Sequence, residues 1–123
     1  KLAPDLDESE VKSCCESLTS RAIDGVIATN TTLDRSRIAG SRFAVEAGGL
    51  SGAPLTEMST RVIAQIKSHV GNQLPIIGVG GIMSAADAIA KREAGADLLQ
   101  LYSGFIYSGP ALIDDILAAL AHD

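Results

Sequence analysis

Short apolar segments alternate with longer amphipathic ones along this chain, and this alternation constrains the fold more than any other feature. Residues 25–28, 75–79 and 97–101 are strand-length segments whose apolar residues are contiguous rather than alternating. Contiguous apolar residues indicate strands that are buried on both faces. Helix-length segments separate these strands, which favours parallel pairing through right-handed crossovers. The sequence therefore predicts an α/β fold built on a parallel sheet.

Four helices are expected between and around the strands, because apolar residues recur there with a period near 3.6. Local signals place the helix starts at the capping box of Asp7 and Glu10, at Ser59, at the capping box of Ser84 and Asp87, and at Pro110. Gly95 is expected to end the third helix. The predicted core faces comprise Val11, Cys14, Cys15, Leu18 and Ala22 in the first helix, Val62, Ile63, Ile66 and Val70 in the second, and Ile113, Ile116, Leu117 and Leu120 in the last.

Two glycine-bearing turns follow the last two predicted strands. They are GVGGI at residues 78–82 and YSG at residues 102–104. Glycine lets backbone N–H groups approach an anion closely, and N–H groups at a helix start carry the positive end of the helix dipole. Two such turns on neighbouring parallel strands are typical of the phosphate site late in (β/α)8 barrels. We therefore expect the amides of both turns to converge on one phosphate, although tight strand-to-helix turns without a ligand would share these glycines.

One long irregular segment runs from residue 29 to about residue 58. It contains TNTT at residues 29–32 and GGLSG at residues 48–52. Irregular segments of this length in compact domains are mostly functional or disordered. Leu50, Pro54 and Leu55 can anchor this one, so we expect an ordered loop that forms part of a site.

The candidate site residues share one edge of the predicted sheet. Lys1, residues 29–31, residues 78–81 and residues 102–103 all fall at the C-terminal ends of successive strands. Each has an ordinary alternative, such as a solvated lysine or a polar turn that bonds its own backbone. In barrels, however, this edge carries the chemistry. The shared position favours a site over a set of unrelated turns.

Charge, cysteine spacing and length exclude several classes of protein. A formal net charge of −5 with scattered basic residues argues against a nucleic-acid binder. Cys14 and Cys15 are adjacent, which suits neither a disulfide framework nor a metal site. No apolar run approaches the length of a membrane span. The 123 residues, which begin at Lys1, are about half of the roughly 250 that a whole barrel needs, so we interpret the chain as part of a longer protein.

Taken together, these segments resemble the dihydroorotate dehydrogenases, and in particular the quinone-linked class 2 members. The resemblance covers almost the whole chain, and it lies in KLAPDL at residues 1–6, IATNTT at 27–32, GGLSG at 48–52, PIIGVGGI at 75–82 and QLYSGF at 100–105. It implies that residues 1–123 form the C-terminal half of a (β/α)8 barrel, as a single half-barrel domain with phosphate turns after its last two strands.

The resemblance also implies an activity, a cofactor and a set of site residues. The activity is oxidation of (S)-dihydroorotate to orotate in pyrimidine biosynthesis, with FMN as cofactor and ubiquinone as electron acceptor. The residues implied to contact FMN are Lys1, Thr29, Gly52, Gly81, Tyr102 and Ser103, and those implied to bind the substrate are Asn30 and Thr31. The Lys1 ammonium would stabilise the negative charge that develops on flavin reduction. No metal ligand is implied.

Some parts of the family's machinery have no counterpart in this sequence. The class 2 catalytic base is a serine in the first half of the barrel, and no serine here lies in a matching motif, so we assign no catalytic residue and expect the chain alone to be inactive. Its expected partner is the missing N-terminal half, or a second copy bound through exposed sheet edges. The chain itself is expected to be soluble, and the full-length protein peripheral to the cytoplasmic side of the inner membrane if the source is bacterial. A non-redox phosphate-binding barrel enzyme and a non-catalytic half-barrel module remain as alternatives.

Overall fold

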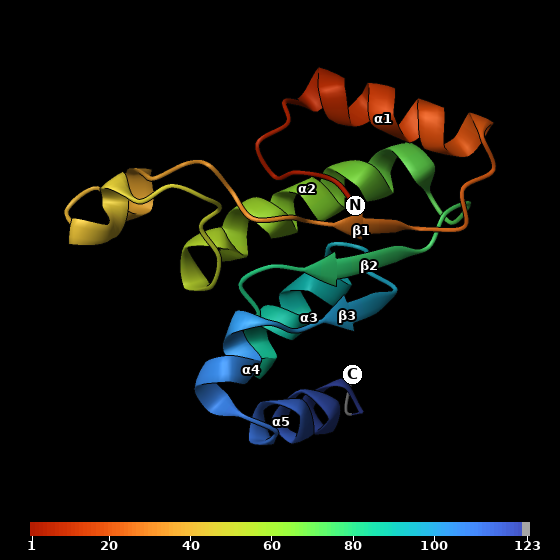
Figure 1. The fold of residues 1–123 in the computed structure, drawn as a ribbon. Helices are drawn as coiled ribbons and strands as arrows, with labels where there is room; N and C mark the ends of the chain where they lie inside the picture. The colour runs from red at the N-terminus through yellow and green to blue at the C-terminus, as the bar shows by residue number, and fades with distance from the viewer. Residues whose placement is uncertain (122–123) are drawn as a thin grey trace.

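The computed structural model describes residues 1–121 as an open parallel sheet with helices packed against it (Figure 1). The three strands run in the order β1-β2-β3 and comprise Val26–Ala28, Ile76–Val79 and Leu98–Gln100. The α-helices are α1 (Glu8–Ser20), α2 (Thr56–Val70), α3 (Ala85–Glu93), α4 (Ser103–Ser108) and α5 (Ala111–Leu120). The predicted α/β fold with parallel strands is confirmed.

The strand register brings the C-terminal ends of all the strands to one edge. Ala28 of β1 lies opposite Gly78 of β2, which in turn lies opposite Leu99 of β3. Leu2 extends this edge beyond β1, because its N–H donates to the Ile27 carbonyl at 3.0 Å and its carbonyl accepts from the Asn30 N–H at 2.7 Å. The first residues of the chain therefore occupy the position of a further parallel strand.

The main core lies between the sheet, α1 and α2. Its buried members are Val11, Cys15, Val26, Ala28, Val62, Ile63, Ile66, Val70, Leu74, Ile76 and Ala96. A smaller cluster joins Ile82 and Ala88 to Leu112 and Ile116 of α5. Contiguous apolar strands and 3.6-period helices predicted the first cluster well, since its helical residues are those of the expected core faces.

Two predicted helix caps are confirmed and one is wrong. Asp7 forms the full capping box with Glu10, and the Ser84 hydroxyl accepts from the Asp87 N–H. Ser59, in contrast, lies inside α2 and is fully buried. The short 3-10 turn η3 (Ala53–Leu55), which contains Pro54, continues directly into α2, so this helix begins at Thr56 without a side-chain cap.

Three other expectations about helix ends and burial are wrong. Ala22 lies beyond the end of α1, at a φ of 50°. In α5 the buried residues are Leu112 and Ile116, whereas Leu117 is 60% exposed, because the helix contacts α3 and α4 along only one side. In β3, Leu98 is 61% exposed. Both faces were expected to be buried, but no described residue covers the sheet face opposite the helices at this strand.

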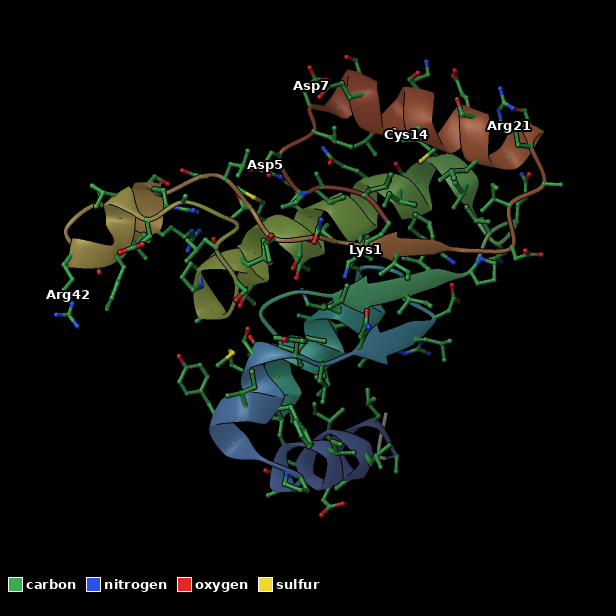
Figure 2. The ribbon with its side chains drawn as sticks, viewed as in Figure 1. Lys1, Asp5, Asp7, Cys14, Arg21 and Arg42 are labelled. Atoms are coloured by element: carbon green, nitrogen blue, oxygen red, sulfur yellow. The ribbon has the colours of Figure 1, made fainter. Side chains whose placement is uncertain are left out.

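The long irregular segment leaves the sheet after β1 and returns before α2. It contains two 3-10 turns, η1 (Ser36–Ile38) and η2 (Arg42–Val45), and it extends away from the rest of the molecule, with Arg42 at its far end (Figures 1 and 2). Among residues 1–121, no helix is both long enough and apolar enough to cross a membrane.

Candidate functional site

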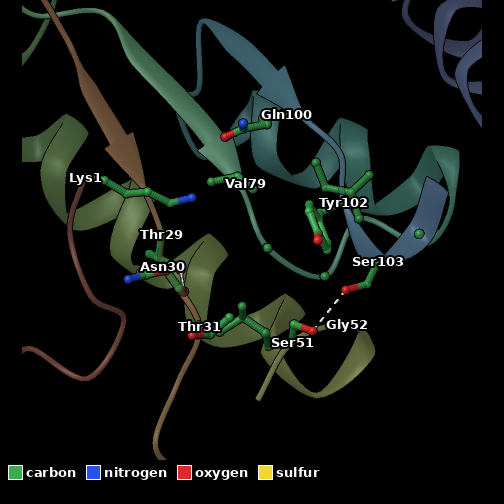
Figure 3. A pocket seen from close by; sticks show the side chains of 15 residues that line it. Lys1, Thr29, Asn30, Thr31, Ser51, Gly52, Val79, Gln100, Tyr102 and Ser103 are labelled. Carbon is green, nitrogen blue, oxygen red and sulfur yellow. Dashed lines mark hydrogen bonds between the residues drawn. The ribbon is translucent and has the colours of Figure 1, made fainter. Parts of the chain in front are cut away.

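A cavity of about 250 Å³ opens at the C-terminal edge of the sheet (Figure 3). All the site residues implied by the sequence line it: Lys1, Thr29, Asn30, Thr31, Gly52, Gly81, Tyr102 and Ser103. They come from segments far apart in sequence, and the common register of the strands brings them together. Ligand pockets typically measure about 300 to 1,000 Å³, so these residues enclose part of a cofactor-sized site.

The segment after β1 is fixed by hydrogen bonds to its neighbours. Thr29 is buried, its N–H donates to the Val79 carbonyl at 2.8 Å, and its hydroxyl donates to the Asn30 carbonyl at 2.9 Å. The buried Thr32 hydroxyl donates to the Asp5 carboxylate. Asn30 and Thr31, which lie between these two anchors, are exposed and line the cavity. Their backbone is therefore held in place, while their side chains are free to bind a ligand.

The glycine loop at residues 48–52 packs directly on this segment. Leu50 and Thr32 exchange backbone hydrogen bonds of 2.8 and 3.1 Å. A Cβ added to Gly49 would lie 1.8 Å from the Thr31 hydroxyl oxygen, so only glycine allows this approach. The Arg35 guanidinium donates to the carbonyls of Thr32, Glu46 and Gly48. The expected ordered loop is thus present, and Arg35 secures it through these three carbonyls.

The turn after β2 points its carbonyls away from the cavity. The Gly80 carbonyl accepts from the Ser59 hydroxyl at 2.8 Å, and the Gly81 carbonyl accepts from the Thr56 hydroxyl at 2.6 Å, both on α2. In a trans peptide the N–H points opposite to the carbonyl. The N–H groups of Gly81 and Ile82 therefore point away from α2, and both residues line the cavity.

The turn after β3 is in van der Waals contact with the turn after β2. A Cβ on Gly104 would lie 2.0 Å from the Ile82 carbonyl oxygen, so the two turns touch through the glycine backbone. Ser103 begins α4, and the first N–H groups of a helix have no partner within it. Within residues 1–121, the N–H groups of Gly81, Ile82, Ser103 and Gly104 make no hydrogen bond to another backbone group.

These free N–H groups fit a phosphate. Backbone amides gathered on glycine turns make a concave, positively polarised surface for an anion. The Ser51 and Ser103 hydroxyls, which bond each other at 3.0 Å, border the same surface. Lys1 extends toward Val79 at the other end of the cavity (Figure 3). The cavity therefore offers an anion site at one end, and a cation with the amide and hydroxyl of Asn30 and Thr31 toward the other.

Sequence reasoning missed two residues that line the cavity and one that lies behind it. Ser51 and Gln100 line the cavity but were not singled out. Gln100 could have been found, because it is a polar residue at the C-terminal end of a strand, like the residues that were chosen. The burial of Lys91 could not have been predicted from the sequence, since a lysine in an amphipathic helix normally indicates a solvated face. It is fully buried behind the turn after β2, and burial lowers its pKa to about 8, with Asp87 acting in the opposite direction.

A parallel α/β sheet with its cavity at the C-terminal strand ends defines part of a (β/α) barrel, and glycine turns that gather amides there are typical of barrels that bind phosphate. The family model for dihydroorotate dehydrogenase matches residues 1–123, and the chain belongs to the dihydroorotate dehydrogenase family. This membership supports the barrel fold that the resemblance implied.

Curated relatives and solved structures agree with this membership. Proteins named dihydroorotate dehydrogenase (quinone) from Leptothrix cholodnii and Pseudoalteromonas translucida are 58% and 56% identical over 120 residues, which is 98% of this chain. Crystal structures of DHODH from Eimeria tenella, one in complex with ferulenol and one ligand-free, match with TM-scores of 0.89 and 0.90 at 35% identity, and the matches cover 98% of this chain and 33% of each of those chains. The chain spans about 35% of the length of the curated relatives it matches.

Proposed function

We propose that this chain is the part of a quinone-dependent dihydroorotate dehydrogenase that holds the cofactor phosphate and one side of the substrate. The full-length protein would oxidise (S)-dihydroorotate to orotate, using FMN, in pyrimidine biosynthesis. The observation that supports this most is the single cavity in which an amide-lined anion site, Lys1, Asn30 and Thr31 meet, in a chain of this family. A non-redox phosphate-binding barrel enzyme needs only the glycine turns and is not favoured.

The glycine turns would hold the FMN phosphate. FMN, when bound, supplies the acceptor for a hydride from the substrate and passes electrons on to a quinone. Gly52, Gly81, Tyr102 and Ser103 would contribute backbone amides to the phosphate, while Thr29 would contact the flavin. Tyr102 is 75% exposed, so its N–H matters more here than its side chain.

Lys1, Asn30 and Thr31 would act near the reacting ring. A lysine ammonium close to a group that becomes negative stabilises that group more after electron transfer than before it, which accelerates the step rather than only binding the ligand. Asn30 offers both a donor and an acceptor, and Thr31 offers a hydroxyl. Together they can match the amide and carboxylate edges of dihydroorotate. The proton acceptor is proposed to lie in a part of the full-length protein outside this chain.

The electron acceptor is proposed to be ubiquinone, because the curated relatives carry the quinone designation. Quinones of this type are apolar and are held in membranes. We therefore infer that the full-length protein works peripherally at a membrane, which in a bacterial source is the cytoplasmic side of the inner membrane. The parts of the protein that contact the membrane are proposed to lie outside residues 1–123.

The full-length protein tests this function directly. The purified protein should be yellow, with a flavin absorption spectrum, and should form orotate from dihydroorotate only when a quinone is supplied. Denaturation should release FMN rather than riboflavin, because the phosphate site is the part of the cofactor pocket found here. A colourless protein, or a flavin protein that does not oxidise dihydroorotate, would contradict the proposal.

A further inference from the structure

Lys91 is buried between α2 and α3, outside the cavity lining. Its exposed fraction is 0%, and among the described residues it forms no ion pair. Its ammonium donates to the Ser59 hydroxyl at 2.6 Å, to the Thr60 hydroxyl at 3.0 Å and to the Thr56 carbonyl at 3.3 Å. All three of its donors are thus used on neutral groups of α2. A buried charge without a carboxylate partner is costly, so its position calls for an explanation.

The hydrogen bonds around Lys91 can run in only one direction. An ammonium only donates, so the Ser59 oxygen must accept from Lys91 and can give its own proton only to a carbonyl. The Gly80 carbonyl lies 2.8 Å from it and the Thr56 carbonyl 3.1 Å. The Thr56 carbonyl already accepts from Lys91 and, at 2.8 Å, from Thr60. Ser59 therefore donates to Gly80.

The Gly80 carbonyl belongs to the same peptide group as the Gly81 N–H. A hydrogen bond from Ser59 holds that peptide in one orientation, with the N–H turned away from α2. Hydrogen bonds in a chain also polarise one another in a low-dielectric interior. A positive charge at the start of the chain draws electron density from the peptide, which makes the N–H at its other end a stronger donor.

We propose that Lys91 is a positioning residue for the phosphate group: through Ser59 it orients the Gly81 N–H toward the cavity and strengthens it as a donor. Lys91 does not touch the ligand. Its charge, which remains largely present near neutral pH, adds a field that favours a dianion. The identification of that dianion as the phosphate of FMN rests on the proposed function.

The comparison of FMN with riboflavin tests the proposal, because the two flavins differ only in the phosphate. Affinities would be measured by quenching of flavin fluorescence on the full-length apoprotein. In Lys91→Met, we expect FMN affinity to fall about 10-fold, while riboflavin affinity stays within about twofold of the wild type. Ser59→Ala should behave in the same way, because it interrupts the chain while leaving the charge.

Two variants serve as matched controls. Thr60→Val removes another hydroxyl that contacts Lys91 but does not contact the turn, and Lys12→Met removes an equal charge from an exposed position on α1. Both should keep the wild-type preference for FMN. Equal losses of both flavins in Lys91→Met, or an unchanged FMN affinity, would overturn the proposal. If Lys91→Met does not fold, the test is the preference for FMN over riboflavin in Ser59→Ala compared with Thr60→Val. An equal preference in these two variants would contradict the proposed role of Lys91.

Failure of the proposed function would be visible separately. A wild-type protein that binds neither flavin contradicts the flavin assignment. Inorganic phosphate would then be titrated against the same variants. Weaker phosphate binding in Lys91→Met and Ser59→Ala, but not in Thr60→Val, would still support the role of Lys91, and equal binding by all of them would refute it.

Discussion

The position of Lys1 is fixed by the backbone hydrogen bonds of Leu2, and its own side chain does not contribute to them. The backbone of Leu2 bonds to Ile27 and Asn30 on β1 and the segment after it. Truncation of the Lys1 side chain therefore leaves the strand pairing intact. This makes Lys1 a clean position at which to separate chemistry from binding.

We expect Lys1→Ala in the full-length protein to slow flavin reduction by dihydroorotate by about 100-fold or more, as for other lost electrostatic contacts to developing charge. Its effect on the dissociation constant of dihydroorotate should be much smaller, because the charge builds only during the reaction. Stopped-flow measurement of flavin absorbance gives both quantities. Equal losses in rate and affinity would mean that Lys1 only binds.

Lys91 predicts a pH dependence of stability. The pKa is about 8 in the folded protein, against an ordinary value of 10.5. Between these values the unfolded chain binds more protons, so the free energy of unfolding should rise with pH across this window, by roughly 3 kcal/mol in total. Below about pH 8 both states are protonated and the full cost of burial is present.

Urea unfolding of the full-length protein on either side of this window measures the effect. The rise in the free energy of unfolding with pH should be absent in Lys91→Met and retained in Lys12→Met. This contrast separates the contribution of Lys91 from those of other titrating groups. Below about pH 8, Lys91→Met should be at least as stable as the wild type, since replacement of a buried charge by an apolar side chain of similar length is often neutral or stabilising. A parallel rise in both variants would argue against the low pKa.

At the scale of single residues, local sequence predicts which residues reach the cavity but not what lies behind them. Thr29, Gly81 and Ser103 were found because a position after a strand is visible in sequence. Lys91 and Arg35 were not found. The burial of Lys91 and the three carbonyl contacts of Arg35 both depend on which elements pack together. Tertiary contacts of this kind leave no periodic signal.

At the scale of elements, the two glycine turns act as one unit because they touch. Gly104→Ala would place a Cβ 2.0 Å from the Ile82 carbonyl oxygen, which is backbone and cannot move aside as a side chain could. We expect a loss of about 1–3 kcal/mol in the free energy of unfolding and at least about 10-fold weaker FMN binding in the full-length protein. Urea unfolding and fluorescence titration measure the two effects.

Gly40→Ala is the matched control for this substitution. A Cβ at Gly40 meets nothing within 4 Å, and this glycine has no positive φ. It should leave stability and FMN binding unchanged to within about 0.5 kcal/mol. Similar losses in both glycine variants would show that the contact between the turns is not the cause.

Helix and strand prediction succeeded where the signal was local and failed where it was not. The capping box at Asp7 and the serine cap at Ser84 are local chemistry, and both helices begin there. The second half of the box expected at Ser84 is replaced, because the Asp87 carboxylate accepts from the Met83 N–H and the Ser84 hydroxyl. Ser59 resembled a cap but lies within α2, because Pro54 sits in a 3-10 turn that leads straight into that helix. Helix α4 was missed, since six residues with a glycine carry too little periodicity to detect.

At the scale of the whole molecule, the uncovered apolar surface predicts self-association. Ile106, Leu98 and Leu117 are 69%, 61% and 60% exposed. Apolar side chains and an open strand edge favour pairing between copies. We expect the isolated 123-residue chain to sediment as more than a monomer at high concentration and to form no orotate from dihydroorotate. A well-behaved monomer, or quinone-dependent activity of this chain alone, would contradict this view.

The cavity draws its walls from Lys1 and from four later segments of the chain, the last of them at residues 100–104. Contacts between such distant segments close large loops at a cost in chain entropy, so we expect them to form after the local helices. A ligand of this cavity can then bind only after the sheet is complete, and it has no affinity for the unfolded or partly folded chain. By mass action it should stabilise the native protein by about 2.7 kcal/mol at a hundred times its dissociation constant. Cofactor supply would in this way set how much of the protein survives, as well as how much of it is active.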